Sequence, residues 1–278
     1  MGLTIHYSLH ARGGDAPARR LIQALHQAAQ DLPFQHLGPI VDLSGNQCGF
    51  DHRGQDDPLR WLLIQACGSV DLEPNCSIRV APRRLLAFTA WPGEGCESSN
   101  IGLCQYPATV DWQGQPLKTK LSGWRWSSFC KTNYASNPAC GGLPHFLQCH
   151  LTVIALLDVA RKLGCLAEVD DEGGFWEKRD LPALAEEVGS WNEMLAALGG
   201  RLKDMLGPGV TSEIARFPKF EALEAAGQTQ LPAGFEKLIP LLRRVAGPVP
   251  STVTTASYPP TPAAARWRRP EPFQPHPP

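Results

Sequence analysis

The sequence predicts an α+β domain with an antiparallel or mixed sheet and helices mainly on one face. Three observations support this class: an alternating strand near the amino end, an amphipathic helix directly after it, and several later strand-like segments separated by turn-rich loops. The expected order is β-α-β, then further strands, then α-β. By analogy, this order fits an elaborated ferredoxin-like sandwich, which by itself fixes no function.

The first segment, residues 3–10, alternates between apolar and polar side chains, which predicts a strand with one buried face. We expect Asp15 to cap the next helix, with Pro17 in its first turn. A second strand is expected over 36–45. Residues 61–67 fit either a short helix or a buried strand, because their apolar run is too short to distinguish the two.

In the second half of the domain we expect three strands joined by turn-rich loops, followed by two helices with one short strand between them. The strands are 83–95, 100–107 and 117–130, the first helix is 142–163, the next strand is 165–169, and the last helix is capped by Asp180. The sequence therefore divides into an α+β domain over 1–206, a helical extension over 207–247 and a tail over 248–278. Ten of the 31 tail residues are proline, which predicts disorder; the alternative is a docking peptide for a protein partner.

Composition argues against several classes of protein. The formal net charge of -1 over 278 residues creates no global field for nucleic acid. No basic segment followed by an apolar stretch marks a secretory signal, and Asp158 interrupts the longest apolar run, so no membrane span is expected. The nine cysteines contain no C-x-x-C pair. We expect a cytoplasmic protein with free thiols and no cofactor.

The candidate site centres on Cys130 and His150. Cys130 ends a strand, and the charge of the adjacent Lys131 would lower the thiol pKa if that side chain folds back. His150 lies mid-stripe on the following helix and should face the interior. If the two side chains meet, Cys130 is a nucleophile and His150 its base, with Glu172 or Asp170 as the carboxylate that orients the imidazole. This arrangement suggests a hydrolase or transferase of small substrates.

The expected substrate surface combines Trp124 and Trp126 with Lys131, His6 and Ser8. The two tryptophans share a strand face with Cys130, so they would form a wall for a flat ligand. Each feature also has a structural interpretation: His150 as a hydrogen-bonded core residue, the tryptophans as a covered sheet face, and the Gly-Gly loop after Glu172 as a tight turn.

Two other functions use overlapping residues. A non-catalytic module could bind a planar ligand or nucleic acid on the tryptophan-bearing sheet face, although the charge balance disfavours nucleic acid. A metal site could use the pattern C-x9-C-x4-H-x3-C formed by Cys130, Cys140, His145 and Cys149. These gaps fit no common zinc module, so no metal is expected.

The segments GLTIHYSL, GWRWSSFCKT and DEGGFWEKRD together resemble a family of uncharacterised bacterial proteins. The resemblance covers most of residues 1–205 and leaves the tail outside. It implies a bacterial protein and carries over no activity.

Overall fold

The computed structural model describes residues 3–206 except 52, 55, 56, 74 and 75, together with residues 214, 217 and 220–227. This part of the chain has the predicted α+β class: a seven-stranded sheet, two separate hairpins and helices packed around them. The predicted disordered tail over 248–278 lies outside the described residues, and so does most of the predicted helical extension.

The main sheet is antiparallel throughout, with the order β11-β1-β10-β7-β6-β2 and with β3 also paired to β6. Its strands are β1 (Thr4–Ala11), β2 (His36–Leu37), β3 (Val41–Ser44), β6 (Arg84–Trp91), β7 (Ser99–Gln105), β10 (Trp124–Lys131) and β11 (Leu166–Asp171). The hairpins are β4 (Gly68–Glu73) with β5 (Cys76–Val80), and β8 (Thr109–Trp112) with β9 (Gln115–Lys118).

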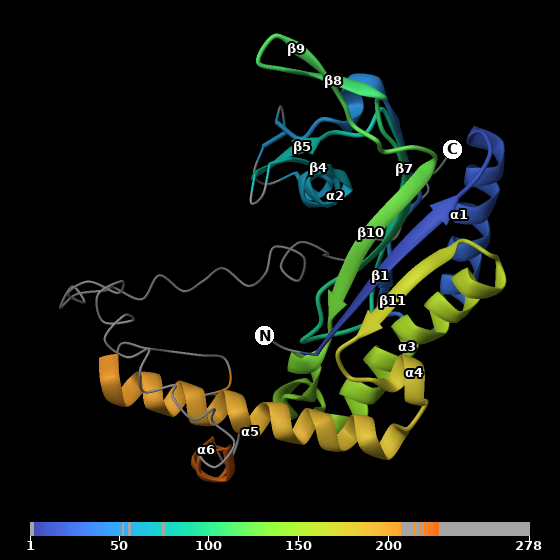
Figure 1. The fold of residues 1–278 in the computed structure, drawn as a ribbon. Coiled ribbons are helices and arrows are strands. Elements are labelled where there is room, and N and C mark those ends of the chain that lie inside the picture. The colour runs from blue at the N-terminus through green and yellow to red at the C-terminus, as the bar shows by residue number, and fades with distance from the viewer. Residues whose placement is uncertain are drawn as a thin grey trace, which may run out of the picture.

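Six α-helices and three 3-10 turns surround the sheet in the described residues. The helices are α1 (Asp15–Gln30), α2 (Pro58–Ala66), α3 (Gly142–Lys162), α4 (Phe175–Lys178), α5 (Leu181–Leu206) and α6 (Phe220–Gly227). The 3-10 turns are η1 (Gly45–Cys48), η2 (Asn133–Ser136) and η3 (Pro138–Cys140). In Figure 1, α1 and α3 lie together on one side of β1, whereas α2 and the β4-β5 hairpin lie on the other side of β10.

The strand predicted directly after the first helix lies away from β1, because β2 and β3 both pair with β6. β11, β1, β10 and β7 are neighbours in that order, α1 lies between β1 and β7 in the chain, and α3 connects β10 to β11. β6, β2 and β3 extend the sheet beyond β7. The ferredoxin-like comparison stays an analogy of strand order.

The pairing of β1 with β10 sorts their side chains onto two faces. Tyr7 lies opposite Ser128 and Leu9 opposite Trp126, and this face is buried against the core. The other face is mostly exposed and we call it the open face: it carries His6, Ser8 and His10 of β1 and Phe129, Ser127 and Arg125 of β10. The alternation predicted for both strands is therefore confirmed, since side chains on a strand alternate between faces.

Several predicted boundaries need correction. Helix α1 has Gly14 at its N-cap, and Asp15 is instead its first residue, where its side chain pairs with Arg84 and Arg19. The ambiguous segment at 61–67 belongs to α2, whose N-cap Asp57 accepts the amide of Leu59. The stretch 36–45 divides into β2 and β3. The strand expected over 117–130 divides into β9 and β10, because residues 119–123 are not in a strand.

Helix α3 spans 21 residues and is long and apolar enough, by length and composition, to cross a membrane. Half of its most apolar window is buried inside the protein. Its buried residues, among them Val153 and Leu157, belong to the same core cluster as Ile5 and Leu9 of β1. The apolar composition of α3 therefore matches its position against the sheet, as in a core helix.

Candidate functional site

Cys130 lies on the buried face of β10 and has no exposed surface. Its thiol donates a hydrogen bond to the carbonyl oxygen of Glu97 at 3.2 Å. Burial raises the pKa of this thiol well above the ordinary range, and the charge of Glu97 adds to the effect. The ammonium of Lys131 instead lies 5.6 Å from the centre of the Tyr134 ring. The expectation that Lys131 activates Cys130 is therefore wrong.

His150 is also fully buried, and hydrogen bonds occupy both of its ring nitrogens. Nδ1 lies 3.0 Å from Oγ1 of Thr132, and Nε2 lies 3.3 Å from Oδ2 of Asp171. The predicted inward position of His150 is confirmed. Its carboxylate partner, however, is Asp171 and not Glu172.

The carboxylate of Asp171 holds the start of α4 as well as the imidazole. Oδ1 accepts the amide of Gly173 and Oδ2 accepts the amide of Trp176, both at 2.9 Å. Burial alone would raise the pKa of Asp171, but the hydrogen bond and charge of His150 and the two amides together hold it below its usual value. This buried network joins α3, β11 and α4, so its evident role is structural.

Glu172 points to a different part of the surface. Its Oε2 accepts the amide of Thr4 at 2.9 Å, and its Oε1 lies 4.0 Å from Nε2 of His6. The His6 ring in turn lies 5.8 Å, centre to centre, from Phe129. Glu172 and His6 are therefore close together, next to the open face, and away from the His150 network.

Trp124 and Trp126 are covered by the core, with 0% and 2% of their surface exposed. Nε1 of Trp126 donates to the carbonyl of Asn100 at 2.8 Å, and a Cβ at Gly102 would come within 2.8 Å of the Trp126 ring. These rings fill the interior and cannot stack on a ligand. They also lie on the opposite face from His6 and Ser8, so the expected combined binding surface does not form.

A different cysteine and histidine do meet, one turn apart on α3. The sulfur of Cys149 lies 3.6 Å from Nε2 and 3.9 Å from Nδ1 of His145. Cys96, from the loop between β6 and β7, packs against the buried cluster that contains Cys149, and the two cysteine side chains are hydrogen-bonded. We call Cys96, His145 and Cys149 the thiol cluster.

The hydrogen bond from Cys96 lowers the pKa of Cys149, although burial opposes this effect. The same bond raises the pKa of Cys96 well above the ordinary range, and burial adds to it. Cys149 is therefore the one of the two thiols that ionises more readily. By contrast, burial raises the pKa of the other core thiols Cys48, Cys67, Cys104, Cys130 and Cys165.

The loop that carries Cys96 is built closely against α3. Nε2 of His145 donates to the carbonyl of Glu94 at 3.0 Å, and the amide of Cys96 donates to the carbonyl of Gly93 at 3.1 Å. A Cβ at Gly93 would lie 2.7 Å from the His145 ring and 2.9 Å from the Cys149 sulfur. Only glycine leaves room for this approach, so Gly93 is part of what positions the thiol cluster.

The thiol cluster is shielded but not sealed. Cys149 itself is 1% exposed and packs with Leu3, Phe146 and residues of α5. Cys96 and His145 are each partly exposed, so two members of the thiol cluster are in contact with solvent.

Metal ligation is not supported in the part of the chain that is described. Within it, no group of three or more histidine, cysteine or acidic side chains is placed to hold a metal ion. Cys130, Cys140, His145 and Cys149, which form the C-x9-C-x4-H-x3-C pattern, are all among these residues.

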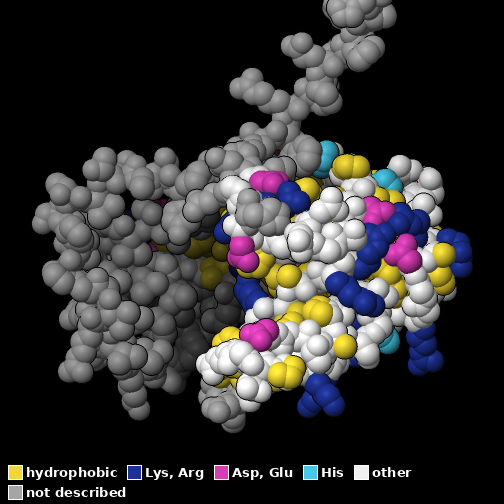
Figure 2. Space-filling view, turned by 90° about the horizontal axis from the view of Figure 1, so that it is seen from above, with side chains coloured by type: hydrophobic (Ala, Val, Ile, Leu, Met, Phe, Trp, Pro, Cys, Tyr) yellow, Lys and Arg dark blue, Asp and Glu magenta, His cyan; other side chains and the backbone are white. Residues whose placement is uncertain are grey.

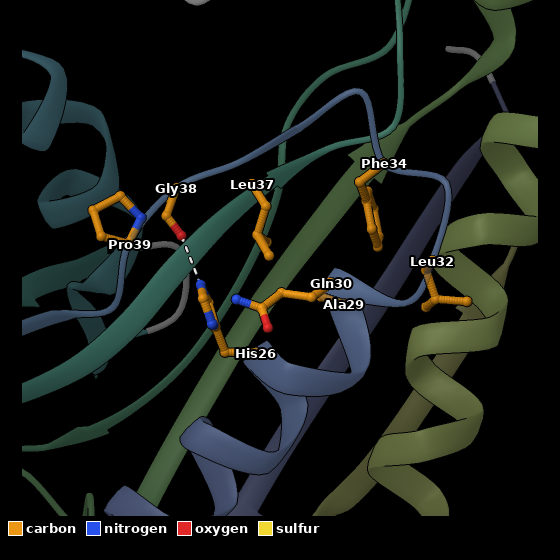
Figure 3. Close-up of a pocket in the computed structure, with 8 residues that line it drawn as sticks. All are labelled: His26, Ala29, Gln30, Leu32, Phe34, Leu37, Gly38 and Pro39. Atoms are coloured by element: carbon orange, nitrogen blue, oxygen red, sulfur yellow. Dashed lines mark hydrogen bonds between the residues drawn. The ribbon is translucent and has the colours of Figure 1, made fainter. Parts of the chain in front are cut away.

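A cavity of about 500 Å³ opens between the end of α1 and the segment through β2 (Figure 3). Its polar side chains are His26 and Gln30, and His26 bonds the Gly38 carbonyl at 2.9 Å. None of the predicted site residues lines it.

Figure 2 shows Lys and Arg interspersed with Asp and Glu, so the face in view has no large patch of one charge.

No family model, curated protein or solved structure matches the chain in our comparisons. The candidate site therefore depends on geometry alone. The sequence did indicate the His145 and Cys149 pair through its four-residue spacing on a helix. It gave no signal for Cys96, whose approach depends on how the β6-β7 loop folds over α3.

Proposed function

We propose that the protein is a cysteine-dependent hydrolase or transferase of small substrates, with Cys149 as the nucleophile. The observation that carries this proposal is the contact of one sulfur with both an imidazole and a donating thiol. A lowered pKa increases the thiolate fraction near neutral pH, and the thiolate is the reactive form of cysteine. Cys130 offers neither feature, because its pKa is raised and its thiol bonds a carbonyl.

The hydrogen bonds suggest a role for each member of the thiol cluster. Because Nε2 of His145 donates to the Glu94 carbonyl, the neutral ring carries its proton there and Nδ1 is left as the acceptor. Nδ1 lies 3.9 Å from the Cys149 sulfur, so a small shift of the ring that shortens this distance would let Nδ1 accept the thiol proton. Cys96 stabilises the resulting thiolate by its hydrogen bond. Glu94 contributes through its backbone, so no side-chain carboxylate takes the orienting role expected of Glu172.

The burial of Cys149 limits what can react there. Only 1% of its surface is exposed, whereas its neighbours Cys96 and His145 are partly exposed. These positions favour a small electrophile over a polymer. They agree with a small-molecule ligand as the partner, and we keep a cytoplasmic location as part of the proposal because all nine cysteines are free.

A competition for alkylation tests the proposal. The full-length protein is treated with limiting iodoacetamide near neutral pH, and labelled peptides are quantified by mass spectrometry. We expect Cys149 to be labelled at least tenfold faster than Cys130, and His145→Gln to slow Cys149 while leaving the partly exposed Cys140 unchanged. Labelling of Cys149 no faster than Cys130 would overturn the proposal.

The open face supports a second candidate, a ligand-binding module without chemistry. His6 and Phe129 form an exposed aromatic pair at 5.8 Å, with Ser127 and Arg125 further along β10. Such a surface could stack a planar ligand. Binding of a labelled short single-stranded oligonucleotide at low salt, lost in Phe129→Ala, would support it; no binding at low salt would dismiss the nucleic-acid version.

A further inference from the structure

We propose that the thiol cluster also reduces hydroperoxides, with Cys149 as the oxidised thiol and Cys96 as the thiol that resolves it into a disulfide. This inference rests on the proposed function in one respect, the reactivity of Cys149. It goes beyond that function because it assigns a redox reaction and a second participating residue. The substrate class is a small hydroperoxide.

The first reason is that the two cysteines are neighbours in one buried cluster. Cys96 packs against the cluster of side chains that contains Cys149, and the Cys149 sulfur lies 3.6 Å from Nε2 of His145. The hydrogen bond between the two cysteines lowers the pKa of Cys149. A peroxidatic thiol needs thiolate character, and a resolving thiol needs to be close to it. Both requirements are met here by residues on separate elements, α3 and the β6-β7 loop.

The second reason is selectivity among the neighbouring thiols. Cys130 and Cys140 are near enough for their charges to affect the cluster. The Cys130 thiol, however, is engaged with the Glu97 carbonyl on the buried face of β10. Cys96 is the thiol that bonds the Cys149 sulfur, and it is partly exposed on a loop.

The third reason is the size of the reagent. Hydrogen peroxide is little larger than water, so it suits a sulfur that is almost covered by its neighbours.

The reaction balances in two steps. The Cys149 thiolate attacks one peroxide oxygen; the S–O bond forms as the O–O bond breaks, and the leaving hydroxide or alkoxide takes a proton from solvent. Cys149 is now a sulfenic acid. The Cys96 sulfur then attacks the Cys149 sulfur; the S–S bond forms as the S–O bond breaks, and the hydroxide leaves as water with the proton of Cys96. The two thiols lose two electrons, and an external dithiol restores them.

Peptide mapping after oxidation tests the assignment. The reduced full-length protein is treated with one equivalent of hydrogen peroxide, quenched with an alkylating agent and digested without reductant. We expect a crosslink between the Cys96 and Cys149 peptides that dithiothreitol reverses. The Cys96→Ser variant should instead accumulate a Cys149 sulfenic acid that dimedone traps, whereas the matched control Cys140→Ser should form the same crosslink as the native protein.

The outcomes separate the two proposals. If Cys149 is alkylated rapidly but peroxide yields no Cys96 to Cys149 crosslink, the redox inference fails and the proposed nucleophile stands. If Cys149 is neither alkylated nor oxidised faster than Cys130, both fail. Turnover gives a second readout: peroxide consumption in the presence of dithiothreitol should fall to the reagent background in Cys149→Ser, and unchanged consumption would overturn the inference.

Discussion

Replacing Asp171 tests whether the buried histidine and carboxylate are structural. Its carboxylate accepts three hydrogen bonds, from His150 at 3.3 Å and from the amides of Gly173 and Trp176 at 2.9 Å each. Removing a charged member of a buried, hydrogen-bonded network costs about 3–5 kcal/mol. We therefore expect Asp171→Ala to lower the free energy of unfolding by about 4 kcal/mol.

The matched variant Asp171→Asn keeps the shape and one acceptor oxygen but loses the charge. Charged hydrogen bonds are roughly twice as strong as neutral ones, so we expect this variant to lose about 2 kcal/mol, half as much as the alanine variant. Urea unfolding followed by tryptophan fluorescence at neutral pH measures both values.

The pH dependence of the unfolding free energy shows whether the charge of Asp171 stabilises the folded state. Because the pKa of Asp171 is lowered in the folded state, its contribution is fully present above the ordinary Asp pKa of about 3.9 and is lost as the pH falls through the folded value. The gap in stability between the native protein and Asp171→Asn should narrow as the pH is lowered from neutral to about 3. A pH-independent gap, or two variants within about 0.5 kcal/mol of the native protein, would refute this reasoning.

Two further substitutions test the thiol cluster and the covered sheet face in turn. Gly93→Ala places a Cβ 2.7 Å from the His145 ring and 2.9 Å from the Cys149 sulfur. We expect the rate of Cys149 alkylation to change at least fivefold, and overpacking to lower the free energy of unfolding by about 1–3 kcal/mol. An unaltered alkylation rate would mean that the loop does not position the sulfur. Trp126→Ala removes a ring that is 2% exposed, so the free energy of unfolding measured in urea should fall by about 3–5 kcal/mol. A decrease below about 1 kcal/mol would instead indicate a ligand-binding surface that contributes little to core packing.

The fold was largely accessible from periodicity. The alternation in β1 and β10 and the apolar stripe of α3 identified elements whose burial follows the same pattern in the structure. Short elements were harder to predict, and the segment that forms α2 stayed ambiguous. The β8-β9 hairpin was treated as part of a turn-rich loop; its turn residues Gln113 and Gly114 both have positive φ values. Such turns depend on one or two residues, too few to produce a period.

The site was less accessible because it depends on which faces meet in space. Residue spacing placed His150 inward, but could not distinguish Asp171 from the adjacent Glu172 as its partner, since neighbours on a strand point to opposite faces. The same limit affected the tryptophans, which alternation placed on one face without showing that His6 and Ser8 lie on the other. Cys96 was missed because its contact with α3 links distant segments of the chain.

The central claim is that Cys149 ionises more readily than an ordinary cysteine because Cys96 donates a hydrogen bond to it. Ultraviolet absorbance of the thiolate, measured across pH as the difference between the native protein and Cys149→Ser, titrates this sulfur directly. The account expects a midpoint below the ordinary cysteine pKa of about 8.5, shifted upward in Cys96→Ala. A midpoint above that value, or one that Cys96→Ala leaves unchanged, would contradict it.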